Sequence, residues 1–361
     1  MNNKTILFQP FTSDKLQLKN RIVMAPMTRS FSPEGVPTQE VADYYARRAE
    51  SEVGLIITEG TVINRVSSSN DPNVPHFYGE KALEGWKNVV EAVHARGGKI
   101  APQLWHMGII PYLKTWRPSE PLEGPSGLID AENKAGSEMT EEDIEKTIAA
   151  FAQSAADAKR IGFDAIELHG AHGYLIDQFF WDKMNKRTDK WGGKTIAERN
   201  NFAVAVIKAV RKEVGEDFPI IIRLSQWKQQ DYTARIAQTP QEMEEWLLPL
   251  SEAGVDIFHC SQRRFWEPEF EGSDLNFAGW AKKITKKPSI TVGSVGLSGE
   301  FLGAFKGESS QPDSIDGLLE RIEKQEFDLV AVGRSLLADP QWTIKIKNDE
   351  ISDLKGFSKE Y

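Results

Sequence analysis

Cysteine is nearly absent from this sequence, since only Cys260 among its 361 residues carries a thiol. A single cysteine cannot form an internal disulfide, and it cannot supply the thiolates of an iron–sulfur cluster. Such scarcity is typical of proteins kept in a reducing compartment, so we expect the protein to be cytoplasmic.

Long apolar runs are lacking as well, and so is an excess of positive charge. No run approaches the roughly 20 apolar residues of a transmembrane helix, and the apolar part of residues 1–11 is too short for a signal peptide. The net charge of −9 disfavours a broad nucleic-acid surface. We therefore expect neither a membrane nor a nucleic acid as a partner.

The sequence does contain short apolar runs, each ended by a small or polar residue. Near-continuous hydrophobicity over so few residues is typical of strands that are buried on both faces, as in a parallel sheet. Eight such runs are found, at residues 21–26, 53–60, 99–105, 163–170, 218–225, 255–261, 288–294 and 327–334.

Segments with helical periodicity alternate with these runs. The clear ones are residues 38–50, 80–98, 140–162, 195–215 and 239–254, and the weaker ones are residues 275–285, 313–326 and 340–349. Eight strands that alternate with eight helices predict an α/β fold, namely a (β/α)8 TIM barrel. A doubly wound sheet is the alternative, but no predicted strand is followed by the glycine fingerprint of that fold.

Two segments lie outside this alternation. Residues 6–21 are expected to form a β-hairpin that precedes the first strand and plugs the bottom of the barrel. Residues 107–139 are rich in Pro and Gly and predict a long loop after the third strand, and such loops are usually functional or mobile. No linker or repeat divides the chain, so we expect residues 1–361 to form a single domain.

Polar residues at the predicted strand ends are the candidates for chemistry, because active sites of this fold lie at the C-terminal ends of the strands. The loops after the seventh and eighth strands are its usual phosphate site. Glycine lets backbone N–H groups approach a phosphate closely, and arginine offers a planar charged fork. The alternative is a pair of ordinary glycine turns beside an arginine in a surface ion pair. The residues concerned are Gly293, Ser294, Gly333 and Arg334.

Arg223 ends a strand that should be buried, where an unpaired charge is costly. Its partner is either a carboxylate such as Glu167, on the preceding strand, or an anionic or electron-rich ligand in the mouth of the barrel. Gln103 ends the third strand, and its amide would bind the edge of a planar heterocycle or satisfy a loop backbone.

His169, His172 and Tyr174 follow the fourth strand and admit three interpretations. A zinc site would need a third ligand such as His259, but the motifs of zinc hydrolases are missing, and we expect no metal. Histidines that are satisfied inside a core are common. As a catalytic cluster, two imidazoles would donate hydrogen bonds to one carbonyl oxygen and the phenol would donate a proton. A bound cofactor with a phosphate and a planar ring would then have to deliver the nucleophile.

Seven segments, in this order, resemble the Old Yellow Enzyme family, whose members are FMN-containing ene-reductases on a (β/α)8 barrel. The resemblance covers nearly the whole chain. The segments are "RIVMAPMTR" (21–29), "GLIITEGT" (54–61), "APQLWHMG" (101–108), "ELHGAHGYLIDQF" (167–179), "NKRTDKWGGKTIAERNNF" (185–202), "IIIRLS" (220–225) and "LVAVGRSLLADPQW" (329–342).

The resemblance assigns FMN as the bound cofactor and implies which residues hold it. Thr28 would lie near O4 of the flavin ring, and Arg223 would face N1 and O2, where negative charge builds on reduction. The other residues implied to contact the ring are Ala25, Pro26, Met27, Gly60 and Gln103. The phosphate would be held by Gly293, Ser294, Gly333 and Arg334.

The resemblance also implies a substrate and a mechanism. His169 and His172 would bind the carbonyl or nitro oxygen of a small electrophilic alkene, and Tyr174 would protonate its α-carbon as hydride reaches the β-carbon. NADPH or NADH would be the reductant in a ping-pong cycle. The "NKRTDKWGGK" motif is expected to shape a long loop rather than to do chemistry. The oligomeric state is left open, with a homo-oligomer among the options.

Parts of the chain depart from the family pattern. Residues 107–139, 223–236 and 260–273 have no clear counterpart, so the choice of substrate is open, although Phe265 or Trp266 would overhang the pocket. Other functions remain as alternatives: an oxidative amine or N-demethylating dehydrogenase on the same barrel, or a flavin-free barrel that binds a phosphate ligand.

Overall fold

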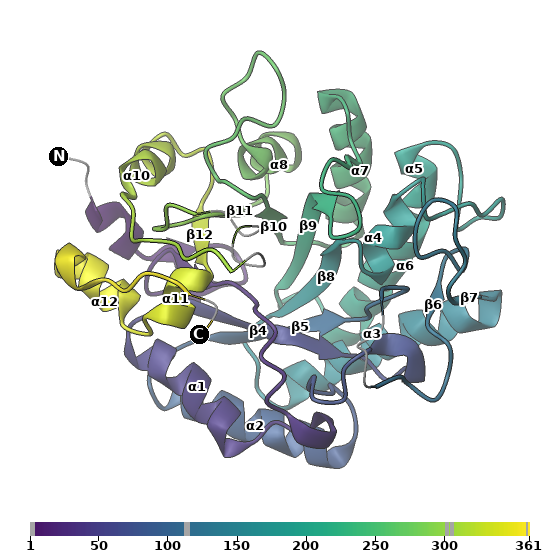
Figure 1. Ribbon diagram of the computed structural model, residues 1–361, viewed down its shortest axis with the longest axis horizontal. Coiled ribbons are helices and arrows are strands. Elements are labelled where there is room, and N and C mark those ends of the chain that lie inside the picture. Colours follow the sequence, from purple (N-terminus) through teal and green to yellow (C-terminus); the bar gives the residue numbers. More distant parts are fainter. Residues whose placement is uncertain (1–3, 112–115, 300–302, 304–306, 359) are drawn as a thin grey trace.

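The computed structural model describes residues 4–111, 116–299, 303, 307–358 and 360–361. Eight parallel strands close into a barrel at the centre of the molecule, and helices surround it (Figure 1). The strands run around the barrel in the order β10-β11-β12-β3-β4-β5-β8-β9. Their bounds are β3 Ile22–Met24, β4 Leu55–Val62, β5 Ile100–Trp105, β8 Ile166–His172, β9 Ile220–Lys228, β10 Ile257–Ser261, β11 Ser289–Val292 and β12 Leu329–Val332. Each falls on one of the eight predicted runs, so the predicted TIM barrel is confirmed.

Each predicted helix is also found. The outer helices are α1 Gln39–Glu50, α2 Glu80–His94, α3 Glu141–Arg160, α5 Ile196–Arg199, α6 Asn201–Val214, α7 Pro240–Ala253, α8 Phe277–Thr285, α10 Asp316–Glu323 and α12 Trp342–Lys347. Two short helices that directly follow barrel strands were not predicted, namely α4 Leu175–Phe180 and α11 Arg334–Ala338. Single 3₁₀ turns lie at Lys4–Phe8, Pro33–Gly35, Val66–Ser68 and Ile351–Asp353. Within the described residues, no helix combines the length and the apolar character needed to span a membrane.

The helix ends follow the sequence closely. Thr140 and Asp143 form a reciprocal capping box at the start of α3, in which each side chain accepts from the backbone N–H of the other residue.

The predicted helix 195–215 is split into α5 and α6 at Asn200, whose side-chain amide donates to backbone carbonyls of Glu245 and Trp246 in α7. This contact ties the helix to its neighbour.

The N-terminal hairpin closes the bottom of the barrel, as predicted. Its strands are β1 Phe11–Thr12 and β2 Gln17–Leu18, which pair antiparallel. Their apolar side chains join a buried cluster with residues that point into the barrel. These residues are Phe11, Leu16 and Leu18 from the hairpin with Val23, Ala25, Leu55, Ile57, Ala101, Ala165, Ile221, Ile257, Ile290, Leu329 and Ala331 from the barrel. The interior is therefore a packed core below the level of the strand ends.

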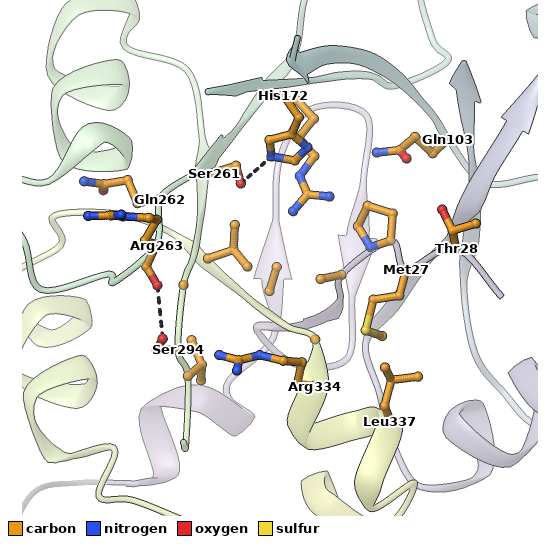
Figure 2. A pocket seen from close by; sticks show the side chains of 18 of the residues that line it. Met27, Thr28, Gln103, His172, Ser261, Gln262, Arg263, Ser294, Arg334 and Leu337 are labelled. Carbon is orange, nitrogen blue, oxygen red and sulfur yellow. Dashed lines mark hydrogen bonds between the residues drawn. The ribbon is translucent and has the colours of Figure 1, made fainter. Parts of the chain in front are cut away.

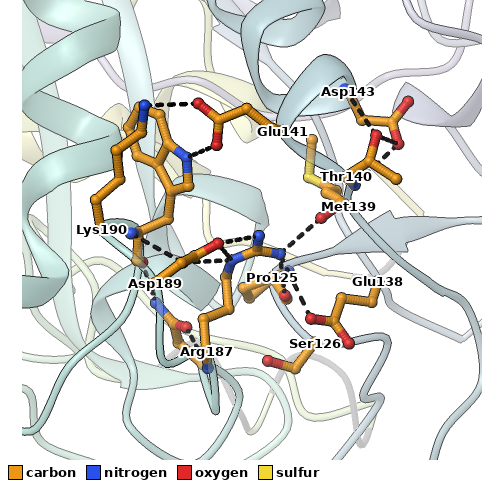
Figure 3. Close-up of polar contacts among 12 residues, drawn as sticks. Pro125, Ser126, Glu138, Met139, Thr140, Glu141, Asp143, Arg187, Asp189 and Lys190 are labelled. Carbon is orange, nitrogen blue, oxygen red and sulfur yellow. Dashed lines mark hydrogen bonds and ion pairs between the residues drawn. The ribbon is translucent and has the colours of Figure 1, made fainter.

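The segment that carries "NKRTDKWGGK" anchors the long loop after β5 (Figure 3). The Arg187 guanidinium donates to the backbone carbonyls of Pro125 at 3.0 Å and Met139 at 2.6 Å. Trp191 and Lys190 both bond the carboxylate of Glu141, at the start of α3. The same loop pairs β6 Glu123–Gly124 with β7 Ser137–Glu138. These contacts are structural, as the sequence predicted.

Candidate active site

A cavity of about 560 Å³ opens at the C-terminal ends of the barrel strands. Its volume lies within the range of small-molecule sites, about 300–1,000 Å³. Among the described residues, every barrel strand except β4 contributes a lining residue or is followed by one. In Figure 2, His172 and Gln103 lie at one end of the cavity, while Ser294 and Arg334 lie at the other.

Nearly all the site residues predicted from the sequence line this one cavity. They are Ala25, Pro26, Met27, Thr28, Gln103, His169, His172, Tyr174, Arg223, Gly293, Ser294, Gly333 and Arg334. The chain positions of these residues span more than three hundred residues, so the barrel closure alone brings them together.

Gly60 is the one candidate that does not line the cavity. It lies in β4 opposite Gln103, and a Cβ atom placed on it would lie 2.2 Å from the ring of Trp105. Glycine at this position therefore makes room for the indole of Trp105, which does line the cavity. The predicted backbone contact of Gly60 with a cofactor stays a prediction.

Arg223 is buried, with 8% of its surface exposed, and its guanidinium donates a hydrogen bond to no described residue. The carboxylate of Glu167 is close enough to favour its charge, but burial is the larger effect and lowers the pKa of Arg223. Glu167 instead accepts from Gln103 Nε2 at 2.8 Å and meets His259 Nδ1 at 2.6 Å. Glu167 was one of the two expected partners of Arg223, but its carboxylate already bonds other side chains. The guanidinium of Arg223 therefore faces the cavity, where the other expected partner, a ligand, would bind.

Gln103 has its amide orientation set by this contact. Because its Nε2 donates to the fully buried Glu167, its Oε1 is the atom of this amide that can accept a hydrogen bond from a ligand in the cavity that Gln103 lines. An arginine fork and an amide oxygen in one cavity match the edge of a planar heterocycle that carries both acceptors and an N–H group.

His169, His172 and Tyr174 form a cluster of rings that lines the same cavity. The ring of His169 meets those of His172 and Tyr174 edge-on, with centroids 5.3 Å and 4.8 Å away. Burial, followed by the charge of Arg223, lowers the pKa of both histidines well below the ordinary value. Both imidazoles are therefore neutral near pH 7, and each has one N–H to donate. Burial raises the pKa of Tyr174, which keeps the phenol protonated.

The backbone around His172 is strained. His172 has a φ of +65°, in the left-handed region that a non-glycine residue rarely adopts. It lies at a bulge between β8 and β9, where its N–H donates to Ser225 Oγ at 2.8 Å and its Nε2 meets Ser261 Oγ at 2.8 Å. Strain that is held in place by surrounding contacts is typical of functional sites.

The opposite end of the cavity carries the predicted phosphate loops. Gly293 has a φ of +143°, and a Cβ atom there would lie 2.6 Å from the carbonyl oxygen of Gln262, so only glycine fits. At Gly333 a Cβ atom would reach only Met27 and Ala25, at 3.5 Å and 3.7 Å, which leaves the backbone open to the cavity. Arg334 donates to the carbonyl of Gly299 at 2.7 Å and to Ser310 Oγ at 3.4 Å, and these contacts orient its guanidinium at this end of the cavity.

Several lining residues were not predicted from the sequence. β9 continues three residues past its predicted end, which brings Trp227 and Gln229 to the cavity, and the loop after β10 adds Gln262 and Arg263. Either Phe265 or Trp266 was expected to overhang the pocket, but neither is among the residues that line it. Phe265 packs in the core instead, and its N–H donates to the carbonyl of Gly293, directly after β11. In the sequence, the only indication that these two segments reach the site was that residues 223–236 and 260–273 have no clear counterpart in the family pattern.

Glu59 was also missed, although it shapes the site. Its carboxylate accepts from the backbone N–H groups of Arg29 at 2.9 Å and Ser30 at 3.2 Å, and so fixes the loop that follows β3. Burial raises the pKa of Glu59 to about 7, against the effect of these hydrogen bonds. Across the part of the chain that the structure describes, no group of three or more His, Cys, Asp and Glu side chains could hold a metal ion.

Comparison with known proteins agrees with this geometry. Residues 6–352 match the NADH:flavin oxidoreductase / NADH oxidase family. The chain is 35% identical to NADPH dehydrogenase from Bacillus velezensis, over 93% of this chain and 92% of that protein. It is 33% identical to NADH oxidase from Thermoanaerobacter brockii, over 97% of this chain but only 52% of that protein, so it spans about half of that relative's length.

The solved structures point the same way. Morphinone reductase in complex with tetrahydroNAD superposes with a TM-score of 0.79 and 28% sequence identity, over 97% of this chain and 92% of that one. Family match, sequence identity and superposition therefore agree with the motifs in the sequence. The chain belongs to the NADH:flavin oxidoreductase family, also called the Old Yellow Enzyme family, whose members bind FMN, and it is an NAD(P)H-dependent flavin oxidoreductase.

Proposed function

We propose that the protein reduces activated C=C bonds, such as those of α,β-unsaturated carbonyls and nitroalkenes, with FMN as its bound cofactor and NADPH or NADH as the reductant. The observation that carries the proposal is the arrangement around Arg223. A buried guanidinium without a hydrogen-bond partner among the described residues faces a cavity that also holds two neutral imidazoles and a phenol. Such a group needs an electron-rich ligand to offset its burial.

The residues present fit FMN. Arg223 and the Oε1 atom of Gln103 would bind the pyrimidine edge, while Ala25, Pro26, Met27 and Thr28 would lie along the ring and Gly60 would add a backbone contact. The phosphate would be held by Gly293, Ser294, Gly333 and Arg334. When bound, FMN would accept a hydride from the nicotinamide and pass it to the alkene in a separate step, which gives ping-pong kinetics.

His169 and His172 would bind the oxygen of the substrate. Nδ1 of His169 accepts from the N–H of Ala171 at 3.4 Å, which leaves its Nε2 protonated and able to donate. His172 would donate from Nδ1, with its Nε2 accepting from Ser261 Oγ at 2.8 Å. Two neutral N–H donors on one oxygen would draw charge from the C=C bond without giving up a proton. Tyr174 would then donate its proton to the α-carbon, since its phenol is protonated and lies beside His169.

The alternatives make different demands on these residues. An amine or N-demethylating dehydrogenase would use the same cavity in the oxidative direction and would not need Tyr174 as a proton donor. A flavin-free barrel that binds a phosphate ligand would leave Arg223, at the far end from the phosphate loops, without a role. The alkene reductase is the one reading that employs both ends of the cavity and the phenol.

We also propose a single FMN-binding domain over residues 1–361, a cytoplasmic location and small-molecule partners. One hydrophobic cluster includes residues from Leu7 to Ile346, which supports the single domain. The one cysteine, Cys260, is buried and free, which suits a reducing compartment.

The test is an anaerobic absorbance titration of the purified protein. NADPH should bleach a yellow protein, and 2-cyclohexen-1-one should restore the colour. Tyr174→Phe should slow the second step and largely spare the first. A protein that bleaches but is not reoxidised by the enone would rule out the simple alkene reductase, and a colourless protein that takes up no FMN would overturn the cofactor assignment.

A further inference from the structure

The segment that follows Arg223 has no counterpart in the family pattern, yet it reaches the active site. Its sequence is "LSQWKQQDY" (224–232), and its first half extends β9 to Lys228. Gln229 comes next, and its Nε2 donates a hydrogen bond of 2.7 Å to the phenol oxygen of Tyr174. Gln229 also donates its backbone N–H to the carbonyl of His172 at 3.3 Å, so main chain and side chain both meet the catalytic cluster.

The position of Gln229 is fixed by the preceding residue, Lys228, which forms a buried ion pair with Asp177. The Nζ of Lys228 and the Oδ1 of Asp177 lie 2.7 Å apart, and both side chains are fully buried. Lys228 also donates to the carbonyl of Ser225, and Asp177 accepts from the N–H of Gly173 at 2.7 Å. This ion pair therefore joins the end of β9 to the turn that carries His172 and Tyr174. Gln229 and Tyr174 are held on two segments that are tied together.

The direction of the hydrogen bond determines what Tyr174 can do. Because Gln229 donates to the phenol oxygen, the O–H of Tyr174 is not used in this contact and is free to point at a substrate. Burial raises the pKa of Tyr174, and the hydrogen bond from Gln229 acts against that rise by favouring the phenolate. Burial keeps the phenol protonated before the reaction, and the hydrogen bond from Gln229 assists the loss of its proton during turnover.

We infer that Gln229 is a positioning residue for proton transfer, which orients the phenol of Tyr174 and stabilises the phenolate that remains after its proton has left. The inference rests on the proposed function, since it requires that Tyr174 protonates the substrate. In that step the O–H bond of Tyr174 would break and a C–H bond would form at the α-carbon, while hydride from the reduced cofactor would supply the C–H bond at the β-carbon. The phenolate is then reprotonated from solvent.

The experiment compares three variants in the two half-reactions by anaerobic stopped flow. Gln229→Met keeps the size of the side chain but cannot donate, and Gln229→Glu can only accept and would repel a phenolate. Gln241→Met is the matched control, because Gln241 is exposed on α7 and, among the described residues, its side chain bonds that of Glu245 alone. Each variant is also made in the Tyr174→Phe background. Reoxidation by dioxygen is followed alongside, since dioxygen presents no α-carbon to Tyr174.

Reoxidation by 2-cyclohexen-1-one should slow by about 10- to 100-fold in Gln229→Met, the range expected for a lost hydrogen bond to a charged group. Gln229→Glu should be slower still. Reduction by NADPH and reoxidation by dioxygen should stay within about twofold of the parent protein, and in the Tyr174→Phe background neither change should matter further. Gln241→Met should match the parent in every step.

Two results would overturn the inference while leaving the proposed function intact. One is an unchanged or faster enone step in Gln229→Met, which would mean that the amide does not support the phenol or holds its proton back. The other is an equal loss in the Tyr174→Phe background, which would mean that Gln229 acts on something other than Tyr174. Failure of the parent protein to be reoxidised by the enone would instead count against the proposed function.

Discussion

The ion pair of Lys228 and Asp177 gives the sharpest test of how this site is built. Both side chains are completely buried, with a charge-assisted hydrogen bond of 2.7 Å between them. Burial lowers the pKa of Lys228 and raises that of Asp177 to about 6, and in each case the partner opposes the effect of burial. Lys228→Met removes the opposing charge and leaves the carboxylate in an apolar surrounding.

The size of the loss can be worked out. Breaking a buried ion pair by removing one partner costs about 3–5 kcal/mol, because the other charge stays buried without compensation. For 361 residues the entropy of unfolding near the midpoint is about 0.8 kcal/mol per kelvin. Lys228→Met should therefore lower the melting temperature by about 4–7 °C.

The assay is a double-mutant cycle followed by calorimetry and chemical denaturation. Asp177→Asn is the second change, because its amide oxygen can still accept from the N–H of Gly173. The double variant buries no charge, so it should recover most of the stability and lie within about 2 kcal/mol of the parent protein. The reasoning is refuted if Lys228→Met costs less than about 1 kcal/mol, or if the two single losses simply add.

Three further predictions concern residues around the barrel. Because burial raises the pKa of Glu59 from 4.5 to about 7, the folded protein retains a proton that the unfolded chain releases. The free energy of unfolding of the parent protein should thus fall as the pH rises from about 4.5 to 7. Measured against Glu59→Gln in denaturation curves across that range, the fall should be at most about 3 kcal/mol. A flat difference would contradict this. Gly60→Ala should cost about 1–3 kcal/mol and disturb the fluorescence of Trp105, since the new Cβ would lie 2.2 Å from the indole; an unchanged melting temperature would argue against that contact. Thr140→Ala should lose about 1 kcal/mol by thermal denaturation, because it opens the capping box with Asp143, whereas Thr140→Ser should retain most of it.

The sequence alone predicted most of the architecture, because the physics that decides it is local. Eight apolar runs and the helices between them were visible as periodicity in the sequence. The short helices α4 and α11 were not, since a single helical turn carries too few residues to establish a period. The family motifs then predicted the candidate site residues, and all but Gly60 line one cavity.

The tertiary structure decided which of these residues have partners and which do not. From the sequence, Glu167 was one of two possible partners for Arg223; only the folded barrel shows that Gln103 and His259 already occupy that carboxylate. The hydrogen bond between Gln229 and Tyr174 could not be predicted from the sequence either, because it joins residues 55 positions apart across a bulge in β9. Sequence patterns record which side chains are apolar and which segments can pair. The hydrogen-bond partner of a buried polar group depends on distances that are set only when the whole barrel has closed.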